Sequence, residues 1–409
     1  MSPYILADDL SGALEAGASF RARGWRVTLP LRPNLIPPTD EAGELQVIST
    51  ETRNAHPAVA RQIVCRTLLE QQAGGARLWF KKVDSTLRGP IGAELLAMIE
   101  VLAPRLLVFC PANPEVGRVV VDGKLLVGGV PLAQTDFRND PAWPATTSDV
   151  RELLARQSVP HAAALKLAEL RNAPDIAFAR CLAEGGLGGR LQTQIVVTDA
   201  ENLDDLRAVV AAAERTAPST VFVGSGALGN VLSERTRGPF ENAEALAMTA
   251  SLALVLCGSR HPASHRQMDH LAMLGKARVL TLAADESTES LRDRVIKAFT
   301  SSRVVAVRIP SELPSGVSTE PPVNRLADVA SSLTTPFDVG VLYLTGGETA
   351  RSVCGALQGE QLEILRELEP GVVVSRLTGP ASGVRVVITK PGGFGGPEAV
   401  ARHLRNCMK

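Results

Sequence analysis

Two adjacent carboxylates stand near the start of the chain, directly after a short apolar run. The run Tyr4-Ile5-Leu6-Ala7 is followed by Asp8 and Asp9 and then by Ser11 and Gly12. Open α/β sheets bind their ligands at the carboxyl ends of the strands, so these side chains occupy a typical binding edge. A carboxylate there can orient or deprotonate a substrate hydroxyl. We expect either Asp8 or Asp9 to act as the base, because neighbouring side chains diverge and only one can point into the site.

A second group of chemically active side chains lies in residues 81–89, after another apolar run. Arg88 could bind a carboxylate through its guanidinium fork, and Lys82 could neutralise a phosphate or a second oxygen. Asp84 and Ser85 could bind sugar hydroxyls. The alternative is a solvated loop with an internal Lys–Asp pair and a helix N-cap at Ser85.

Two further polar turns follow apolar runs in the first half of the chain. One is Ser49-Thr50-Glu51-Thr52-Arg53, and the other spans residues 111–118 and contains Asn113, Glu115 and Arg118. Both could face a ligand. Alternatively, the first is an N-cap with a surface arginine, and the second is a proline-stiffened turn without a ligand.

Glycine-rich turns follow three apolar runs in the second half. They occupy residues 256–264, 344–350 and 390–396. Glycine lets the backbone approach a phosphate, and the N-terminus of a following helix offers free N–H groups and a positive dipole end. Such glycines also serve ordinary tight turns. The chain contains neither a GxxxxGK[ST] loop nor a GxGxxG after its first strand, so no familiar nucleotide motif explains these turns.

Continuous apolar runs that alternate with helical patterns predict the elements that position these turns. Runs of this kind are typical of parallel strands buried on both faces, so we expect an α/β fold with mostly parallel sheets flanked by helices. A break at residues 236–250 separates an expected first domain, 1–236, from a second domain, 250–409. Residues 128–144 and 310–322 are expected to be loops. The predicted strands are Tyr4–Ala7, Leu45–Ile48, Leu78–Phe80, Leu106–Cys110, Gln194–Val197, Thr220–Val223, Leu252–Leu256, Arg278–Leu282, Val304–Ile309, Gly340–Leu344 and Val384–Ile388.

Composition excludes several classes of partner. The chain has 409 residues with 43 Lys+Arg and 43 Asp+Glu, and aromatic residues make up only 4%. Zero formal net charge and scarce aromatics argue against a nucleic acid or an anionic membrane surface as a partner. The six cysteines form no CxxC pair, which is typical of a reducing compartment, and we expect a cytoplasmic protein. His261 and His265 flank Pro262, and we expect no metal site there.

Four motifs, taken together and in order, resemble the four-carbon acid sugar kinase family. They span nearly the whole chain, and each alone is weak. They are Ala7-Asp8-Asp9-Leu10-Ser11-Gly12-Ala13, Lys81-Lys82-Val83-Asp84-Ser85-Thr86-Leu87-Arg88-Gly89, Gly346-Gly347-Glu348-Thr349-Ala350 and Lys390-Pro391-Gly392-Gly393-Phe394-Gly395.

The resemblance implies an ATP- and Mg²⁺-dependent kinase that acts on threonate, erythronate, 3-oxo-tetronate or a similar acid, with its site between a sugar-acid domain and a nucleotide domain. A homodimer is expected from general frequency. The alternative is a non-catalytic sensor that retains the fold. By motif match, Asp8 and Asp9 are catalytic, and the substrate is bound by Ser11, Arg53, Lys82, Asp84, Ser85 and Arg88. The nucleotide is bound by Ser259, Gly346, Gly347, Glu348, Thr349, Gly392 and Gly393.

The chain departs from the family pattern at three places. The usual Asp-Thr-Asp-Ser-Arg turn is Ser49-Thr50-Glu51-Thr52-Arg53 here, Asn113 stands where an aromatic residue is common, and Pro391 stands where Ser is common. The first two lie on the substrate side and bear on which acid is used. The third lies in a loop whose glycine backbone is expected to make most of the nucleotide contacts.

Overall fold

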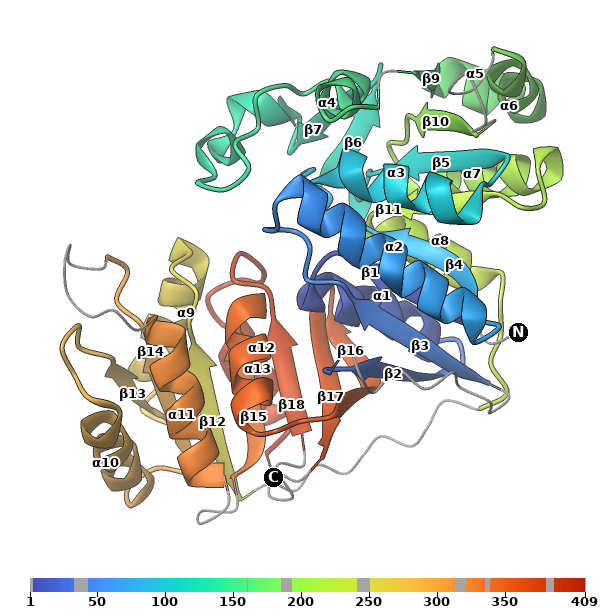
Figure 1. Ribbon diagram of the computed structural model, residues 1–409. Coiled ribbons are helices and arrows are strands. Elements are labelled where there is room, and N and C mark those ends of the chain that lie inside the picture. Colours follow the sequence, from blue (N-terminus) through green and yellow to red (C-terminus); the bar gives the residue numbers. More distant parts are fainter. Residues whose placement is uncertain are drawn as a thin grey trace. The chain divides into compact units, whose positions relative to one another are not determined.

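The computed structural model describes residues 3–32, 43–159, 161–184, 193–240, 251–312, 321–334, 339–379 and 386–408 (Figure 1). Its contacts divide the chain into two compact units. The first unit comprises Met1–Trp25 and Pro38–Pro239, and the second comprises Arg26–Pro37 and Phe240–Lys409. Each unit is described by itself below.

The first unit is built on a parallel sheet with the strand order β3-β1-β4-β11-β5-β10-β9. Parallel neighbours require crossover connections, and helices supply most of them. The strands are β1 (Pro3–Ala7), β3 (Glu44–Ser49), β4 (Arg77–Lys82), β5 (Leu106–Cys110), β9 (Ala162–Leu165), β10 (Gln194–Thr198) and β11 (Val221–Gly224). The helices are α1 (Leu10–Arg21), α2 (Pro57–Ala73), α3 (Ile91–Leu102), α4 (Val150–Arg156), α5 (Leu167–Asn172), α6 (Pro174–Ala183), α7 (Leu203–Thr216) and α8 (Gly226–Glu234).

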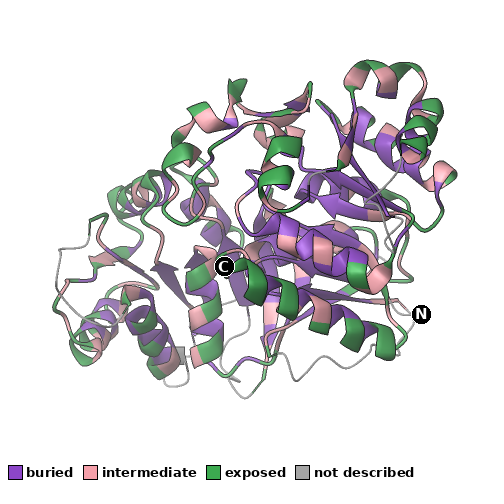
Figure 2. Ribbon diagram, turned by 45° about the horizontal axis from the view of Figure 1, so that its top comes forward, coloured by how far each residue is buried: buried purple, intermediate pink, exposed green. Residues whose placement is uncertain are grey.

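Helices cover both faces of this sheet, which explains the continuous apolar runs. Helices α2 and α3 pack together, and α1, α8 and α7 pack in series on the opposite face (Figure 1). Every residue of β5 and β10 is buried, and the strands form the buried centre of the unit (Figure 2). The predicted class of mostly parallel α/β architecture is therefore confirmed.

The segment expected to be a long loop at residues 128–144 has local structure. A small antiparallel sheet forms from β6 (Arg118–Val121), β7 (Lys124–Val127) and β8 (Val130–Pro131). Two short 3₁₀ helices follow at Leu132–Gln134 and Asp136–Asn139. The buried Asp199 carboxylate accepts the backbone N–H groups of Asp122 and Gly123, both at 2.9 Å, and so anchors the β6–β7 turn to the main sheet.

The second unit contains a mixed sheet with the order β13-β14-β12-β15-β18-β17-β16-β2. The strands β13, β14, β12, β15 and β18 are parallel to one another. The sheet continues with β17, β16 and β2, each of which pairs antiparallel with its neighbour. The strands are β2 (Arg26–Pro30), β12 (Leu252–Cys257), β13 (Arg278–Thr281), β14 (Val304–Arg308), β15 (Val339–Thr345), β16 (Gln361–Glu369), β17 (Val372–Thr378) and β18 (Val386–Lys390). The helices are α9 (Pro262–Met273), α10 (Thr288–Phe299), α11 (Pro322–Thr334), α12 (Gly347–Ala356) and α13 (Ala399–Arg405).

Strand β2 belongs to the second unit, although the expected domain bounds include it in the first domain. The expected first domain, 1–236, includes residues 26–30, for which no strand is predicted, but these residues form β2 and pair with β16 of the second unit, for example Leu29 with Leu362. The backbone hydrogen bonds of this pairing determine where the strand belongs, and a short apolar run does not reveal its pairing partner.

Parts of two predicted connections, residues 241–250 and 313–320, lie outside the described residues. Within the described ranges, none of the helices combines the length and hydropathy that crossing a membrane requires.

Candidate functional site

The polar turns of the first unit meet at the carboxyl edge of three neighbouring strands. Strand β1 lies between β3 and β4, and Ala7 is in register with Ser49 on one side and Lys82 on the other. The backbone N–H groups of Thr52 and Arg53 donate to the Asp8 carbonyl at 2.9 and 3.2 Å. The sheet order therefore brings together residues that are far apart in the sequence.

Arg53 connects the two adjacent carboxylates. Its Nε and Nη2 donate to Asp8 Oδ2 and Oδ1 at 2.9 and 3.0 Å, and its Nη1 donates to Asp9 Oδ2 at 2.5 Å. Asp9 is also the N-cap of α1, because its Oδ1 accepts the Gly12 N–H at 2.7 Å. One planar guanidinium thus fixes both carboxylates.

The two aspartates have different electrostatic environments. Burial alone would raise the pKa of Asp8, but the charges of Arg53, Lys81 and Lys82 together hold it below its ordinary value. Burial and the negative charge of Asp8 raise the pKa of Asp9. The Asp9 side chain is 18% exposed, and that of Asp8 only 3%. Asp9 is therefore the more reachable carboxylate and the one more ready to accept a proton.

Lys82 lies beside the start of α1. Its Nζ is 3.1 Å from Glu15 Oε2, and the Lys82 side chain is almost fully buried. A Cβ added to Gly12 would lie 2.8 Å from Asp9 Oδ1 and 3.0 Å from Lys82 Nζ. Gly12 is thus required by the close approach of these two charged groups to the helix.

A buried ion pair lies next to the two aspartates and the 49–53 turn. Lys81 Nζ lies 3.1 Å from Glu94 Oε2, and both side chains are almost fully buried. The Thr52 hydroxyl donates to the other Glu94 oxygen and is 2.7 Å from the Thr50 hydroxyl. The Thr52 and Glu94 side chains thereby tie the 49–53 turn to α3.

The loop after β4 forms the other side of the cluster. Arg88 Nε and Nη2 donate to the Asp84 carboxylate at 2.8 and 3.2 Å, and Arg88 Nη1 is 3.7 Å from Asp140. The Arg118 Nη1 donates to the Ser85 hydroxyl. The guanidinium groups of Arg88 and Arg118 each lie 5.9 Å from the centre of the Phe137 ring.

Several members of this cluster lie outside the set of site residues predicted from the sequence. The sequence motifs do not include Glu15, Glu94, Phe137 or Asp140, and they indicate Arg118 only as a residue that could face a ligand. Glu15 had a usable signal, because it is the one charged residue among the apolar residues 10–20 that form most of α1. Among the predicted residues, Ser11 lies in the first turn of α1, and its side chain forms no hydrogen bond with the cluster among the described residues.

The glycine turns of the second unit also meet at one edge. They follow β12, β15 and β18, which are adjacent in the sheet. A Cβ on Gly392 would lie 2.1 Å from Ser259 Oγ, and a Cβ on Gly258 would lie 2.2 Å from Thr349 Oγ1. Gly346, the N-cap of α12, has a φ of 103°, and its N–H donates to the Lys390 carbonyl at 2.8 Å.

The loop after β18 turns its carbonyl groups toward buried donors. Lys390 Nζ donates to the carbonyls of Pro391 and Phe394 at 2.8 and 3.0 Å, and Ser264 Oγ donates to that of Gly392 at 2.7 Å. Gln267 Nε2 lies within 2.8–3.1 Å of three carbonyls, those of residues 394–396. Among the described residues, the N–H groups of Gly392 and Gly393 meet no acceptor. The loop therefore offers backbone donors to an anion.

The remaining predicted residues of this unit are Gly347, Glu348 and Gly393. Gly347 begins α12, and Glu348 is exposed in its first turn. A Cβ on Gly393 would lie 3.3 Å from His261 Nε2. The helix has no side-chain cap at Gly346, so its first N–H groups are available to a ligand.

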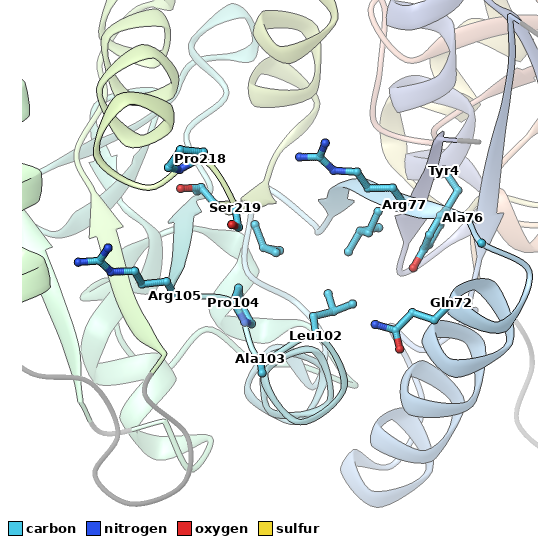
Figure 3. Close-up of a pocket in the computed structure, with 14 residues that line it drawn as sticks. Tyr4, Gln72, Ala76, Arg77, Leu102, Ala103, Pro104, Arg105, Pro218 and Ser219 are labelled. Carbon is cyan, nitrogen blue, oxygen red and sulfur yellow. The ribbon is translucent and has the colours of Figure 1, made fainter. Parts of the chain in front are cut away.

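A cavity of about 860 Å³ lies at the opposite, amino-terminal edge of the first unit's sheet (Figure 3). It is lined by the first residues of strands, such as Tyr4 and Arg77, and by the ends of α2 and α3, including Gln72 and Ala103. None of the predicted site residues lines it. The cavity is separate from the charged cluster, which lies beyond the last residues of the same strands.

Two family models match consecutive parts of the chain. A sugar-binding N-terminal domain matches residues 4–232, and a nucleotide-binding C-terminal domain matches residues 254–400. A solved structure from Haemophilus influenzae is 20% identical, covers 99% of this chain and 100% of its own, and superposes with a TM-score of 0.74. One from Salmonella typhimurium LT2, also 20% identical, covers 99% of both chains with a TM-score of 0.78. Both share the fold.

Curated relatives cover almost the full length at similar identities. D-threonate kinase of Salmonella typhimurium is 28% identical over 97% of this chain and 96% of its own. D-erythronate kinase of Heliobacterium modesticaldum is 28% identical over 97% and 94%, and 3-oxo-tetronate kinase of Pectobacterium atrosepticum is 27% identical over 97% of both. The chain therefore belongs to the four-carbon acid sugar kinase family and is a phosphotransferase that acts on a hydroxyl group.

Proposed function

We propose that this protein transfers the γ-phosphoryl group of ATP, with Mg²⁺, to a hydroxyl of threonate, erythronate, 3-oxo-tetronate or a closely similar acid. The first unit binds the acid and the second binds the nucleotide. The names of the relatives and of the two domain models support this assignment. The observation that carries it is the unequal Asp8–Asp9 pair held by Arg53.

In this proposal Asp9 is the base. Its carboxyl group is more exposed than that of Asp8, and burial beside Asp8 raises its pKa. Asp8 accepts two hydrogen bonds from Arg53 and serves to orient the Arg53 guanidinium. Asp9 would accept the proton of the attacking hydroxyl, while the surrounding cations compensate negative charge on the reactants. Catalysis of this kind depends mainly on positioning and charge neutralisation.

The glycine turns bind the phosphates in this proposal. The N–H groups of Gly392 and Gly393 and the first N–H groups of α12 provide uncharged donors, which suits a polyanion. Ser259 lies against Gly392 and would hold that loop in place. Thr349 is buried against Gly258 and has a packing role.

Mg²⁺ fits this donor set only as an ion brought by the nucleotide. The described residues contain no group of three or more side chains suited to hold a metal ion. Mg²⁺ commonly binds through phosphates with one or two carboxylates, and Glu348 is exposed in the first turn of α12. A carboxylate beside phosphates is unfavourable unless a cation lies between them, so Glu348 is the residue that would hold the ion. The ion would neutralise charge on the phosphates.

An ADP-release assay over a panel of four-carbon sugar acids tests the proposal. We expect ATP- and Mg²⁺-dependent turnover with at least one acid and its loss in Asp9→Asn. Absence of turnover with every acid, combined with no thermal shift on adding ATP, would contradict it. Tight acid binding without turnover would instead indicate the non-catalytic sensor.

A further inference from the structure

The buried cations of the charged cluster are paired with carboxylates in every case but one. Arg53 binds Asp8 and Asp9, and Arg88 binds Asp84 and faces Asp140. Lys81 and Lys82 have their own partners, Glu94 and Glu15. Among the described residues, Arg118 forms an ion pair with no carboxylate.

The surroundings of Arg118 hold it firmly without neutralising it. One guanidinium nitrogen donates to the Ser85 hydroxyl, and the ring of Phe137 lies beside the group. Its Nε is buried and has no hydrogen-bond partner. The carboxylates that attract Arg118 electrostatically are Asp84 and Glu15, which are already bound by Arg88 and Lys82.

A half-buried guanidinium with a buried, unbonded Nε and no carboxylate partner is costly unless a ligand supplies the missing partner. Burial accordingly lowers the pKa of Arg118, whereas neighbouring carboxylates keep the pKa values of Arg53 and Arg88 above the ordinary value despite burial. Arg118 is nevertheless only partly covered, so an anion can reach it. A guanidinium binds a carboxylate with two parallel hydrogen bonds.

We propose that Arg118 binds the carboxylate of the sugar acid and so makes the enzyme select an acid over the corresponding alditol. This inference rests on the proposed function and names the recognition element of its site. Arg88 and Lys82 were the residues expected from the sequence for this task, but a substrate carboxylate would have to displace Asp84 or Glu15 from them. The Phe137 ring contacts the guanidinium groups of both Arg88 and Arg118.

Calorimetric titration of erythronate and threonate, without nucleotide, measures the acid affinity directly. Loss of a charge-assisted pair with a carboxylate lowers affinity by roughly 10- to 100-fold. We expect Arg118→Gln to weaken acid binding to that extent, with ATP binding changed less than 2-fold. Arg138→Gln, on the exposed face of the same loop, should bind the acid as the wild type does.

Two outcomes would overturn the inference. One is an acid affinity of folded Arg118→Gln within 3-fold of the wild type. The other is an equal loss in Arg138→Gln, which would show that any positive charge near the loop has the same effect. Failure of the proposed function is a different result. If the wild type binds the acid through Arg118 but turns over no ATP, the kinase proposal fails and the carboxylate assignment stands.

Discussion

Arg53 and Asp8 form a two-pronged ion pair that joins the ends of β3 and β1, with N···O distances of 2.9 and 3.0 Å. Asp8 is almost fully buried and the Arg53 side chain is 16% exposed, and the third guanidinium nitrogen also binds Asp9. The geometry requires a planar fork, because a single ammonium group cannot meet both Asp8 oxygens and Asp9 at once.

Replacing Arg53 by Lys should therefore destabilise the first unit although the charge is kept. We expect a loss of about 2–3 kcal/mol in the free energy of unfolding, because at least one charge-assisted hydrogen bond is lost in a buried place. Urea titration measures this change. Arg61→Lys is the control, since the Arg61–Glu100 pair is about half exposed and should change stability by about 0.5 kcal/mol or less. Equal effects of the two substitutions would contradict the role given to Arg53.

Asp9→Asn should remove activity without removing the fold. Asn is as good an N-cap as Asp, so the bond from the Gly12 N–H is kept. Loss of a general base typically costs 10²- to 10⁴-fold in kcat. Because the pKa of Asp9 is raised, ionisation of its carboxyl group lowers the free energy of unfolding as the pH rises through that pKa. The neutral side chain of Asn avoids this cost, so the variant should remain folded at neutral pH. The acid limb of kcat/KM should have its midpoint above 3.8, the ordinary value for Asp.

Asp8→Asn is the matched comparison and should behave in the opposite way. The lowered pKa of Asp8 means that its ionised form stabilises the fold above the ordinary pKa, and that this contribution is lost as the pH falls. Removing the charge leaves Arg53 with one carboxylate, which should cost about 3 kcal/mol or more. Urea unfolding of both variants between pH 4 and pH 8 would separate them. If Asp9→Asn is the less stable of the two, the assignment of roles is wrong.

Gly392→Ala should weaken nucleotide binding selectively. A Cβ at this position would lie 2.1 Å from Ser259 Oγ, so the loop must move away from its present place. We expect the KM for ATP to rise roughly 10-fold or more while the affinity for the acid stays unchanged. Gly355→Ala in α12 is the control, because no atom lies within 4 Å of the added Cβ. That change should leave both KM values unaltered and stabilise the helix by up to about 1 kcal/mol.

Much of the fold follows from local sequence pattern. The apolar runs at Leu106–Cys110 and Val304–Ile309, for example, match β5 and β14 to within one residue. Strands buried on both faces are read easily, since every position must be apolar. The hairpin of β16 and β17 is not evident from the sequence, because β16 has charged residues at half-exposed and exposed positions, such as Glu363 and Glu367 respectively.

The candidate site was only partly accessible to such reasoning. Asp8, Asp9 and the 81–89 segment stand out because charged residues follow apolar strands. The importance of Arg118 depends on which carboxylates are already occupied, and pairing across the sheet is not visible in sequence. Lys390 is only the first residue of a glycine-rich turn in the sequence, and the structure shows that its ammonium group donates to carbonyls of its own loop.

Lys390 should link nucleotide binding to pH. Burial lowers its pKa to about 8, and its ammonium group holds the carbonyls of the loop that is proposed to bind the phosphates. Bound phosphates place negative charge nearby and should raise this pKa. Binding of MgADP should therefore take up a fraction of a proton at pH 8.5, where phosphates are fully ionised, and affinity should fall as the pH rises above about 8.

Calorimetry in buffers of different ionisation enthalpy measures this proton uptake. Lys390→Arg keeps a cation that does not titrate in this range, so it should bind MgADP with an affinity that no longer depends on pH. At pH 6.5 the wild type is already protonated at Lys390, and no uptake from this group is expected. Affinity of the wild type that is constant from pH 7.5 to 9.5, with no proton uptake, would show that Lys390 does not sense the nucleotide.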